Sequence, residues 1–590
     1  MLELAGVAAD DALLAGWRER VVRARARLGW SESVAIVRRH ATGASLAIAA
    51  PCDQLFVATE INEWALCATL DERDPARWRL LPQALLAAAI SNATEPAAVI
   101  APVLAEDAAQ ARFERLAAAE ARPALRALLA AAGEHLLPYV LDETLLTLGA
   151  GSGGRDYPLQ ALPAAGEVPW AALHDVPTAV ITGSNGKTTT VRLLAACVTA
   201  AGRVAGYSCT DGVFIGAEAQ ASGDYSGPAG ARLVMRDRRT QTAIIEAARG
   251  GILRRGIAVS AAHVALVTNI SADHFGEYGI HDLDGLAAVK LSVAGLVGRD
   301  GLLVLNADDP LLRAGAEKLA ARLGHVPPLG WFALHADLAL LREHRARGGA
   351  TCGVRAGVLV LSQAGVEHAL GPVARMPLTV DGSATYNLAN LAAAALGAAA
   401  LGIPLDVIAT VFARFGADPA DNMGRLMRFE VGGVQVLMDY AHNPDGLHGL
   451  LEVAQHLRGG KGRLGLILGH AGNRLDADIA ALAQVAAQFR PALVVVKENE
   501  AHLRGRAPGE IPRLIRAELL RCGLPDSALP MCTTELGAAR CALEWSRPGD
   551  VLALPVHAAA ARAAVLAMLT LESQAAARRA AGRTGPNGTL

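Results

Sequence analysis

Apolar and polar positions alternate in a regular way from Val176 onward. Short aliphatic runs are followed by glycine-containing loops, and each loop leads into a longer segment with apolar residues every three or four positions. A strand covered on both faces is apolar throughout, so this order predicts a mostly parallel sheet with helices on both faces. The expected strands are 176–182, 242–246, 264–269 and 302–306, and the expected helices are 187–201 and 283–297.

A second segment of the same kind starts near Arg425, with expected strands at 434–439, 464–469, 492–497 and 550–555. Before residue 170 the pattern differs. Strand-like runs at 45–49 and 54–59 stand among Ala- and Leu-rich segments of helical periodicity, and 81–105 is expected to be a buried helix.

Glycine and proline mark the expected boundaries. The glycine-rich stretch 149–155 and the proline-containing stretch 158–169 are typical of connectors between units. Residues 573–590 contain Arg, Gly and Pro without an apolar stripe, and we expect them to be disordered. The chain is therefore expected to divide into domains at 1–170, 171–424 and 425–572, followed by a tail at 573–590.

Composition excludes several classes of protein. Of the 590 residues, 52% are hydrophobic and 19% charged, which excludes disorder for most of the chain. A net charge of -2 gives no electrostatic basis for binding nucleic acid or an anionic membrane surface. The eight cysteines include no CxxC pair, the first residues lack the pattern of a signal peptide, and no apolar run is long enough for a membrane span. These features favour a reduced, cytoplasmic protein.

The clearest chemical signal is the segment TGSNGKTTT at 182–190, between an expected strand and an expected helix. Glycines allow the backbone N–H groups of such a loop to point at phosphate oxygens, and the positive end of the helix dipole adds to the attraction. Lys187 can reach the β- and γ-phosphates, and the Thr188 hydroxyl can bind Mg²⁺. The sequence therefore predicts a nucleotide site, although Ile181 stands where the general phosphate loop has another glycine.

This shortened loop resembles the ATP-binding loop of the Mur ligase family, amide-forming ligases that use ATP. Other parts of that family's pattern follow in the expected order, at 242–253, 267–274, Lys290, 306–310, 424–425 and 439–444. The resemblance implies an α/β multidomain fold: a central P-loop ATPase domain and a C-terminal Rossmann-like α/β domain, preceded by an α+β N-terminal domain.

The resemblance also implies roles for individual residues. The loop residues expected to bind ATP are Gly183, Asn185, Gly186, Lys187, Thr188 and Thr189. With Thr188, residues Glu246 and His274 would form the magnesium site, because carboxyl ends of neighbouring parallel strands meet at one crevice. Lys290 resembles a lysine that many members carry as a carbamate, which would make it a further metal ligand.

Four further residues complete the site that the resemblance implies. One precedes the domain boundary expected at residue 424, and three follow it. Asn306 is similar to the asparagine that contacts adenine in the family, while Arg425 and Asp439 would contact phosphate and ribose. His442 would position the phosphate or the incoming amine. Residues 386–390 occupy a position where many members have His-Asn, and we interpret this helix start as mainly structural.

Within the family, segments 246–253, 503–510 and, more weakly, 50–64 are similar to cyanophycin synthetases. Those enzymes carry an ATP-grasp domain between the corresponding parts, and here a short connector takes its place, so we expect no polymer synthesis by this chain alone. Residues 470–474 lie where relatives recognise the incoming amino acid, but they lack the acidic, Asp-Arg-rich composition of cyanophycin synthetases.

The predicted activity is ATP- and Mg²⁺-dependent joining of a carboxylate to an amino-acid amine, with an aspartate-containing peptide or cyanophycin-like acceptor. Two alternatives remain: a ligase for an unrelated small peptide or secondary metabolite, and a Mur-fold subunit that binds ligands for a partner enzyme. The expected partners are these small-molecule or peptide substrates, without nucleic acid or membrane. Homo-oligomerisation is left open.

Overall fold

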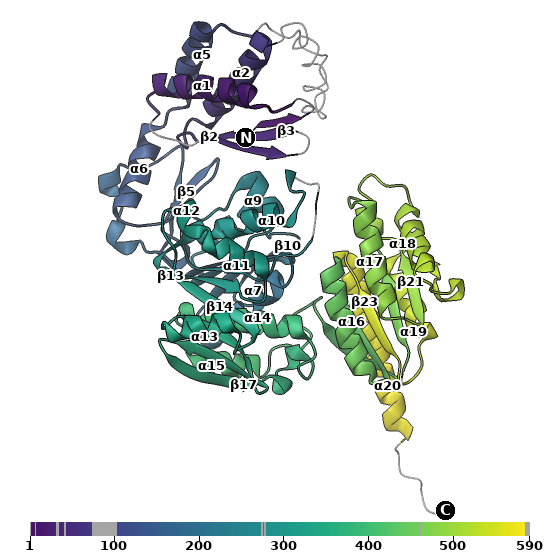
Figure 1. The fold of residues 1–590 in the computed structure, drawn as a ribbon. Coiled ribbons are helices and arrows are strands. Elements are labelled where there is room, and N and C mark those ends of the chain that lie inside the picture. The colour runs from purple at the N-terminus through teal and green to yellow at the C-terminus, as the bar shows by residue number, and fades with distance from the viewer. Residues whose placement is uncertain are drawn as a thin grey trace, which may run out of the picture.

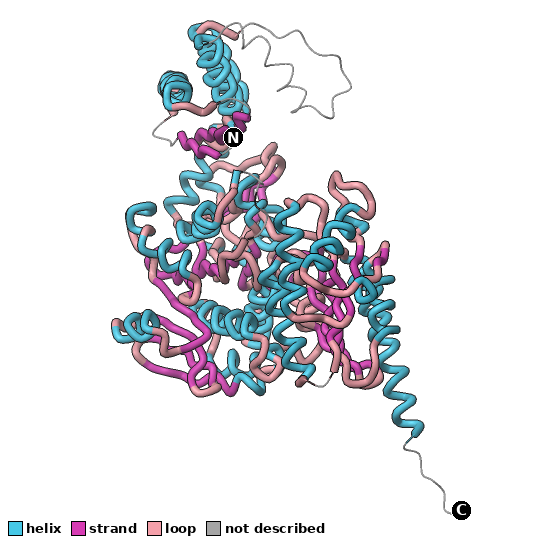
Figure 2. The backbone as a smooth tube through the Cα atoms, turned by 45° about the vertical axis from the view of Figure 1, so that its right-hand side comes forward, coloured by secondary structure: helices cyan, strands magenta, loops and turns pink. Residues whose placement is uncertain are grey.

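The computed structural model describes residues 2–5, 8–30, 35–40, 43–73, 103–272, 275, 279–460 and 462–583. Within these ranges the strands form four sheets, which follow one another along the chain (Figure 1). An N-terminal unit stands at one end of a central unit, and a C-terminal unit lies beside the central unit (Figures 1 and 2). The α/β fold class that the sequence predicts is confirmed.

The N-terminal unit packs helices on one side of a small antiparallel sheet of order β1-β3-β2. Its elements are β1 (Leu2–Ala5), α1 (Asp11–Arg27), β2 (Ala35–His40), β3 (Gly43–Ile48), α2 (Leu55–Arg73) and α5 (Glu106–Glu120). The strand predicted at 54–59 is wrong: this segment belongs to α2, because Val57, Ile61 and Ala65 recur at helical spacing and are fully buried in the helical core. Most of the helix predicted at 81–105 lies outside the described residues.

A second antiparallel sheet, of order β4-β5-β6, follows helix α6 (Pro123–Glu134). Its strands are β4 (Tyr139–Leu141), β5 (Leu145–Leu148) and β6 (Arg155–Pro158). The glycine-rich stretch between β5 and β6 is closely packed. Gly151 has φ +50, and a Cβ there would lie 2.3 Å from the Thr240 carbonyl oxygen of the central unit. These glycines permit close packing against the central unit, and the interpretation of 149–155 as a connector between units stays a prediction.

The central sheet has the order β10-β9-β8-β11-β7-β12-β13-β14-β15-β16-β17, counted over the described residues. The strands from β8 to β15 along this order are parallel, and antiparallel hairpins extend both edges. Its strands are β7 (Thr178–Thr182), β8 (Ala205–Cys209), β9 (Gly212–Ile215), β10 (Glu218–Ser222), β11 (Thr242–Glu246), β12 (Ala262–Val267), β13 (Val297–Asn306), β14 (Leu329–His335), β15 (Ala350–Arg355), β16 (Val358–Gln363) and β17 (Val366–Pro372).

Helices cover both faces of this sheet, as the sequence predicts. They are α7 (Lys187–Ala200), α8 (Pro228–Arg236), α9 (Arg249–Arg255), α10 (Leu283–Lys290), α11 (Pro310–Glu317), α12 (Leu319–Leu323), α13 (Ala339–Ala346), α14 (Thr385–Ala400) and α15 (Leu405–Phe412). The helix predicted at 283–297 is α-helical only to Lys290 and continues as a 3₁₀ helix, Leu291–Leu296.

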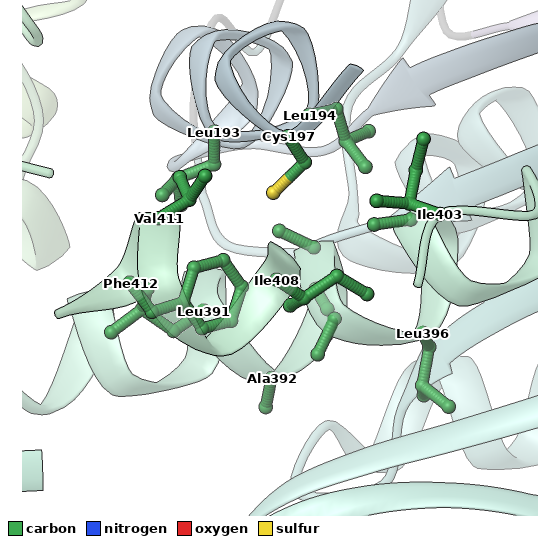
Figure 3. Close-up of a cluster of buried hydrophobic side chains, with 14 of the residues drawn as sticks. Leu193, Leu194, Cys197, Leu391, Ala392, Leu396, Ile403, Ile408, Val411 and Phe412 are labelled. Atoms are coloured by element: carbon green, nitrogen blue, oxygen red, sulfur yellow. The ribbon is translucent and has the colours of Figure 1, made fainter. Parts of the chain in front are cut away.

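A large core joins the helix after the phosphate loop to the rest of the central unit. Figure 3 shows Leu193, Leu194 and Cys197 of α7 facing Leu391 and Leu396 of α14, with Ile408, Val411 and Phe412 of α15 completing the cluster. Each of these side chains is almost fully buried. Close packing of this kind resists deformation, so α7 and α14 form one body.

The C-terminal sheet has the order β18-β19-β23-β20-β21-β22 among the described residues, and it is parallel except for the β18–β19 pair. Its strands are β18 (Met427–Val431), β19 (Val434–Asp439), β20 (Leu464–Leu468), β21 (Leu493–Lys497), β22 (Met531–Cys532) and β23 (Val551–Pro555). Helices α16 (Pro444–Arg458), α17 (Asp476–Gln488) and α18 (Glu510–Arg521) cover one face. Helices α19 (Glu535–Trp545) and α20 (Ala559–Arg583) cover the other.

Helix α20 continues to Arg583 and extends away from the C-terminal sheet (Figure 2). The disorder predicted from residue 573 is therefore wrong as far as 583, because the alanine- and arginine-rich segment has high helix propensity. Residues 584–590 lie outside the described part of the chain. None of the described helices combines the length and the apolar character that crossing a membrane requires.

Candidate functional site

The phosphate loop follows β7, which lies between β11 and β12 in the central sheet. Gly186 has φ +82 and immediately precedes α7, and a Cβ on it would lie 2.1 Å from Asn390 Oδ1. Only glycine satisfies both conditions. The Lys187 ammonium donates to the carbonyl oxygens of Gly183 and Ser184, both at 3.0 Å. An ammonium has three donors, so one remains for an anion above the loop.

Glu246 lies beside the start of α7 and is fully buried. Its carboxylate accepts hydrogen bonds from the hydroxyl of Thr188 at 2.8 Å and from the hydroxyl of Thr210 at 3.0 Å. Glu246 ends β11 and Thr210 follows β8, so parallel strands bring the two residues to one edge of the sheet. A hydroxyl and a carboxylate in contact are ligands of the kind that Mg²⁺ uses beside nucleotide phosphates.

A pocket of about 360 Å³ opens above this loop, between the central and C-terminal units. One wall comes from the phosphate loop, from Glu246 and from the start of α14; the other comes from the end of β19 and from α16. Asn443 Nδ2 of the C-terminal unit donates to Asn185 Oδ1 of the phosphate loop at 2.9 Å. This hydrogen bond crosses the pocket rim and connects the two walls.

Two predicted nucleotide contacts, Arg425 and Asp439, line the C-terminal wall. The guanidinium of Arg425 lies 4.1 Å from the centre of the Tyr440 ring, a cation–π contact. The Asp439 carboxylate accepts backbone N–H bonds from Leu426 at 2.6 Å and from Ala441 at 2.7 Å. Burial raises the pKa of Asp439, and the nearby Arg425 opposes that rise. Asp439 therefore also fixes the backbone around the pocket.

Asp211 connects the central and C-terminal units through arginines. Its carboxylate accepts hydrogen bonds from Arg192 of α7 at 3.0 Å and from Arg562 of α20 at 2.8 Å, and Arg425 lies 4.0 Å away. The four side chains are between 9% and 16% exposed. Asp211 follows Thr210, so the same turn contacts both Glu246 and the arginine cluster.

The segment between α15 and β18 contacts α7, the helix that follows the phosphate loop. Asn422 Nδ2 donates to Thr189 Oγ1 at 3.3 Å, and Arg192 donates to the Met423 carbonyl oxygen at 2.8 Å. Both contacts join this linker to α7 rather than leaving it free between the units.

The pocket brings together most of the predicted site residues. Those that line it are Asn185, Gly186, Lys187, Thr188, Thr189, Glu246, Asn306, Arg425, Asp439 and His442. Gly183 belongs to the loop beneath. Lys290 is buried at the end of α10 and is not among the lining residues. His274 lies outside the described residues, so the predicted roles of His274 and Lys290 stay predictions.

Asn306, which is expected to contact adenine, makes side-chain hydrogen bonds to nearby backbone groups. Its Nδ2 donates to the Thr268 carbonyl oxygen at 3.0 Å, and its Oδ1 accepts from the Asp308 N–H at 2.9 Å. The side chain is almost completely buried but still contributes to the pocket wall. Its expected contact with adenine stays a prediction.

Sequence reasoning did not assign a role to many residues of the pocket wall, and two of them contain polar atoms without a partner among the described residues. Tyr386, interpreted as mainly structural, lines the pocket, as does Asn422. The Tyr386 hydroxyl and Asn422 Oδ1 are buried without a hydrogen-bond partner in the described structure. Burial raises the pKa of Tyr386 well above its ordinary value, with the neighbouring Asp439 adding to the rise. A tyrosine at a helix start carries no signal by itself, and only the docking of the units brings it to the pocket.

The pocket fits ATP and Mg²⁺. Its loop presents the first turn of α7, whose N–H groups have no partners within the helix, and its walls contain the two unpartnered polar atoms described above. The described residues contain no group of three His, Cys, Asp or Glu side chains that could hold a metal alone. Magnesium bound by Thr188 and Glu246 would complete its shell with phosphate oxygens and water.

Two segments of the chain match known protein domains. Residues 181–327 match the Mur ligase middle domain, and residues 424–554 match the Mur ligase, glutamate ligase domain. Two segments of the chain thus match Mur ligase domains, and the resemblance seen in the sequence is confirmed.

Among individual proteins, two cyanophycin synthetases are similar to this chain. The chain is 36% identical over 340 residues to the cyanophycin synthetase of Crocosphaera subtropica, covering 58% of this chain and 38% of that protein. It is 35% identical over 384 residues to the cyanophycin synthetase of Trichormus variabilis, covering 64% of this chain and 42% of that protein. The chain therefore spans about two fifths of the length of these relatives.

A solved structure of E. coli FolC in complex with ADP, without folate substrate, is also similar. Its TM-score is 0.49 at 17% identity, covering 68% of this chain and 90% of that one.

Proposed function

We propose that this protein is an ATP-dependent C–N ligase that joins a substrate carboxylate to an amino-acid amine and releases ADP and phosphate. One observation carries the proposal: a single pocket has the phosphate loop with Thr188 and Glu246 on one wall and Arg425 with His442 on the other. The two Mur ligase domains and the cyanophycin synthetase relatives support the same reaction class.

The central wall binds the nucleotide phosphates. The third N–H of the Lys187 ammonium and the first turn of α7 provide positive potential there. When bound, ATP supplies the phosphoryl group that activates the carboxylate as an acyl-phosphate, and Mg²⁺ supplies the charge that neutralises the phosphates. Glu246 orients the Thr188 hydroxyl toward the metal side of the loop.

The C-terminal wall completes the site. Arg425 adds a permanent cation, and His442 positions the phosphate or the incoming amine. The Asn443–Asn185 hydrogen bond holds this wall against the loop, which excludes water from an intermediate that water would hydrolyse. Catalysis then rests on positioning and charge rather than on a protein nucleophile.

For the substrates we propose an aspartate-containing peptide or cyanophycin-like acceptor and an amino-acid amine. The amine would bind near residues 470–474, which follow β20 at the carboxyl edge of the C-terminal sheet. His470 and Arg474 are buried there, at 5% and 8% exposure. The cytoplasmic location and the absence of nucleic-acid partners stay predictions from composition.

The test is phosphate release with Mg-ATP across a matrix of carboxylate acceptors and amines. β-Aspartyl peptides and cyanophycin fragments serve as acceptors, and arginine, lysine and ornithine as amines. We expect release that needs one acceptor and one amine together, and loss of that release in Lys187→Ala. Lys318→Ala is the matched control, because Lys318 is exposed and does not line the pocket.

Two results would overturn the proposal. Full turnover in Lys187→Ala would show that the phosphate loop does not carry the reaction. Nucleotide binding without phosphate release for any pair would instead support the subunit that binds ligands for a partner enzyme.

A further inference from the structure

Beneath the C-terminal wall of the pocket lies an ion pair with no exposed surface. Lys497 is the last residue of β21, and Glu535 is the first residue of α19. Both side chains are 0% exposed, and the Lys497 ammonium contacts a Glu535 carboxylate oxygen. A pair this deeply buried loses so much hydration that it adds little net stability compared with apolar side chains of similar size. Its presence therefore calls for another explanation.

His557 extends this pair into a chain of contacts. It follows β23 by two residues, and its side chain is 6% exposed. Its Nδ1 lies 3.4 Å from the Lys497 ammonium, and its Nε2 lies 3.0 Å from the Ala441 carbonyl oxygen. A carbonyl oxygen only accepts hydrogen bonds, so Nε2 carries the proton and the Nδ1 lone pair accepts from the ammonium. The same Nδ1 also lies 3.5 Å from Glu535 Oε1. Burial lowers the pKa of His557 to about 4, which keeps the ring neutral near pH 7.

Glu535 fixes the other side of the same histidine. Its carboxylate accepts the backbone N–H of His557 at 3.0 Å and that of Ala558 at 2.8 Å. Glu535 thus holds the His557 backbone, and the ring Nδ1 lies close to both Lys497 and Glu535. Glu535 of α19 contacts Lys497 of β21, Lys497 contacts His557, and His557 contacts Ala441.

Ala441 belongs to the loop at residues 440–443, which directly follows β19 and reaches the candidate active site. His442 of this loop lines the pocket, and Asn443 makes the hydrogen bond to Asn185 of the phosphate loop. The Tyr440 ring lies against His557 at a centroid distance of 5.6 Å. At Ala441, the loop is held within the C-terminal unit by the His557–Ala441 hydrogen bond and by the bond from Ala441 N–H to Asp439. Its last residue, Asn443, caps α16.

We propose that Lys497, Glu535 and His557 are positioning residues that hold the 440–443 loop, and with it His442 and Asn443, in register with the phosphate loop. None of the three lines the pocket. They act through the Ala441 carbonyl. The effect on turnover rests on the proposed ligase function, whereas the effect on the loop does not.

Hydrogen exchange of the ligand-free protein, followed by mass spectrometry, tests the proposal. His557→Phe removes the donor to Ala441, and we expect amides of peptides covering 440–446 to exchange about tenfold faster, as one lost buried hydrogen bond allows. His557→Gln keeps a side-chain N–H donor and should restore slow exchange. The paired replacement K497M/E535Q removes both charges and keeps an acceptor for the two backbone N–H groups, and it should loosen the same peptides.

Asp550→Asn is the matched control for a buried polar contact in the same sheet. Asp550 is 4% exposed and binds Arg463 at the amino edge, away from the loop. It should change exchange near residues 462–464 and leave 440–446 unchanged. Once substrates are known, His557→Phe should lower kcat at least tenfold with little change in the KM for ATP, and His557→Gln should recover most of it.

Unchanged exchange at 440–446 in His557→Phe would overturn the proposal. Equal acceleration over the whole C-terminal sheet would also overturn it, because that result shows a general structural role. If His557→Phe does not fold, the K497M/E535Q pair decides by the same criterion. A loosened loop in a protein without ligase activity would refute only the proposed function, and an active enzyme with an unmoved loop would refute only this inference.

Discussion

Replacing Asp211 by asparagine should weaken the contact between the central and C-terminal units. Asparagine keeps the shape of the side chain and removes the negative charge that lies within 4.0 Å of Arg192, Arg425 and Arg562. Arg192 belongs to the central unit, whereas Arg425 and Arg562 belong to the C-terminal unit. The substitution therefore leaves repelling cations on both sides of the interface, and the loss should appear as undocking rather than as unfolding.

The size of the effect follows from burial. Removing one partner from a fully buried pair costs about 3–5 kcal/mol, while exposed pairs contribute about 0–1 kcal/mol. Side chains that are 9–16% exposed resemble the buried pair more than the exposed one, and the Asp211 carboxylate opposes the lowering of the Arg562 pKa that burial causes. We expect a loss of about 2–3 kcal/mol, which is roughly a 30- to 150-fold shift toward the undocked arrangement.

Limited trypsin digestion of the linker at residues 413–426 measures this shift, and small-angle X-ray scattering gives the accompanying change in overall dimensions. Glu367→Gln is the control, because it breaks an ion pair with Arg355 whose side chains are 34% and 40% exposed. Cleavage of Asp211→Asn that is no faster than cleavage of the control would refute the reasoning. It would mean that the arginine charges are balanced without Asp211.

Three further perturbations have defined outcomes. Gly186→Ala should weaken ATP binding at least tenfold in calorimetry, because its Cβ would lie 2.1 Å from Asn390 Oδ1. Glu246→Gln should raise the Mg²⁺ concentration needed for half-maximal phosphate release about tenfold or more, because it removes a charge from the metal side of the loop. Acid should destabilise the protein between pH 6.5 and 4, because the unfolded chain protonates His557 near 6.5 and the folded chain only near 4; this contributes about 3 kcal/mol at most.

Each of these predictions has a result that would contradict it. Gly202→Ala matches Gly186→Ala, since Gly202 has φ +78 with open space around it; equal ATP affinity in both variants would contradict the steric argument. An unchanged Mg²⁺ dependence in Glu246→Gln would exclude Glu246 from the metal site. The stability of His557→Gln should depend less on pH over the same window, and an identical profile in thermal unfolding would assign the acid sensitivity to other groups.

Much of the central unit could be predicted because its signals are local. A phosphate loop between an aliphatic strand and a helix places Lys187 and Thr188 without further information. The end of a second strand then places Glu246, since parallel strands share an edge. The strand at 54–59 failed for the same local reason. Val57 and Thr59 favour a strand, but Val57 also begins the row of buried residues at helical spacing that continues with Ile61 and Ala65, and tertiary packing decides between the two.

The clusters that join distant segments were not predictable from one sequence. Lys497, Glu535 and His557 come from three separate elements, and each one alone is typical of an ordinary surface position. Asp211 lies in a short turn with nothing to distinguish it from a solvated carboxylate. Only the relative placement of the two α/β units gives these residues their partners, and that placement has no local pattern.

The contacts of the linker with the phosphate helix have a mechanical consequence. Because α7 is packed against α14 and α15 in the core shown in Figure 3, we expect the central wall of the pocket to deform little and any opening of the pocket to come from movement of the C-terminal unit. The segment that joins the two units is attached to α7 through Asn422 and Met423. If ATP binds at the phosphate loop as proposed, a movement of the C-terminal unit should change the affinity for ATP, and bound ATP should in turn change the position of that unit.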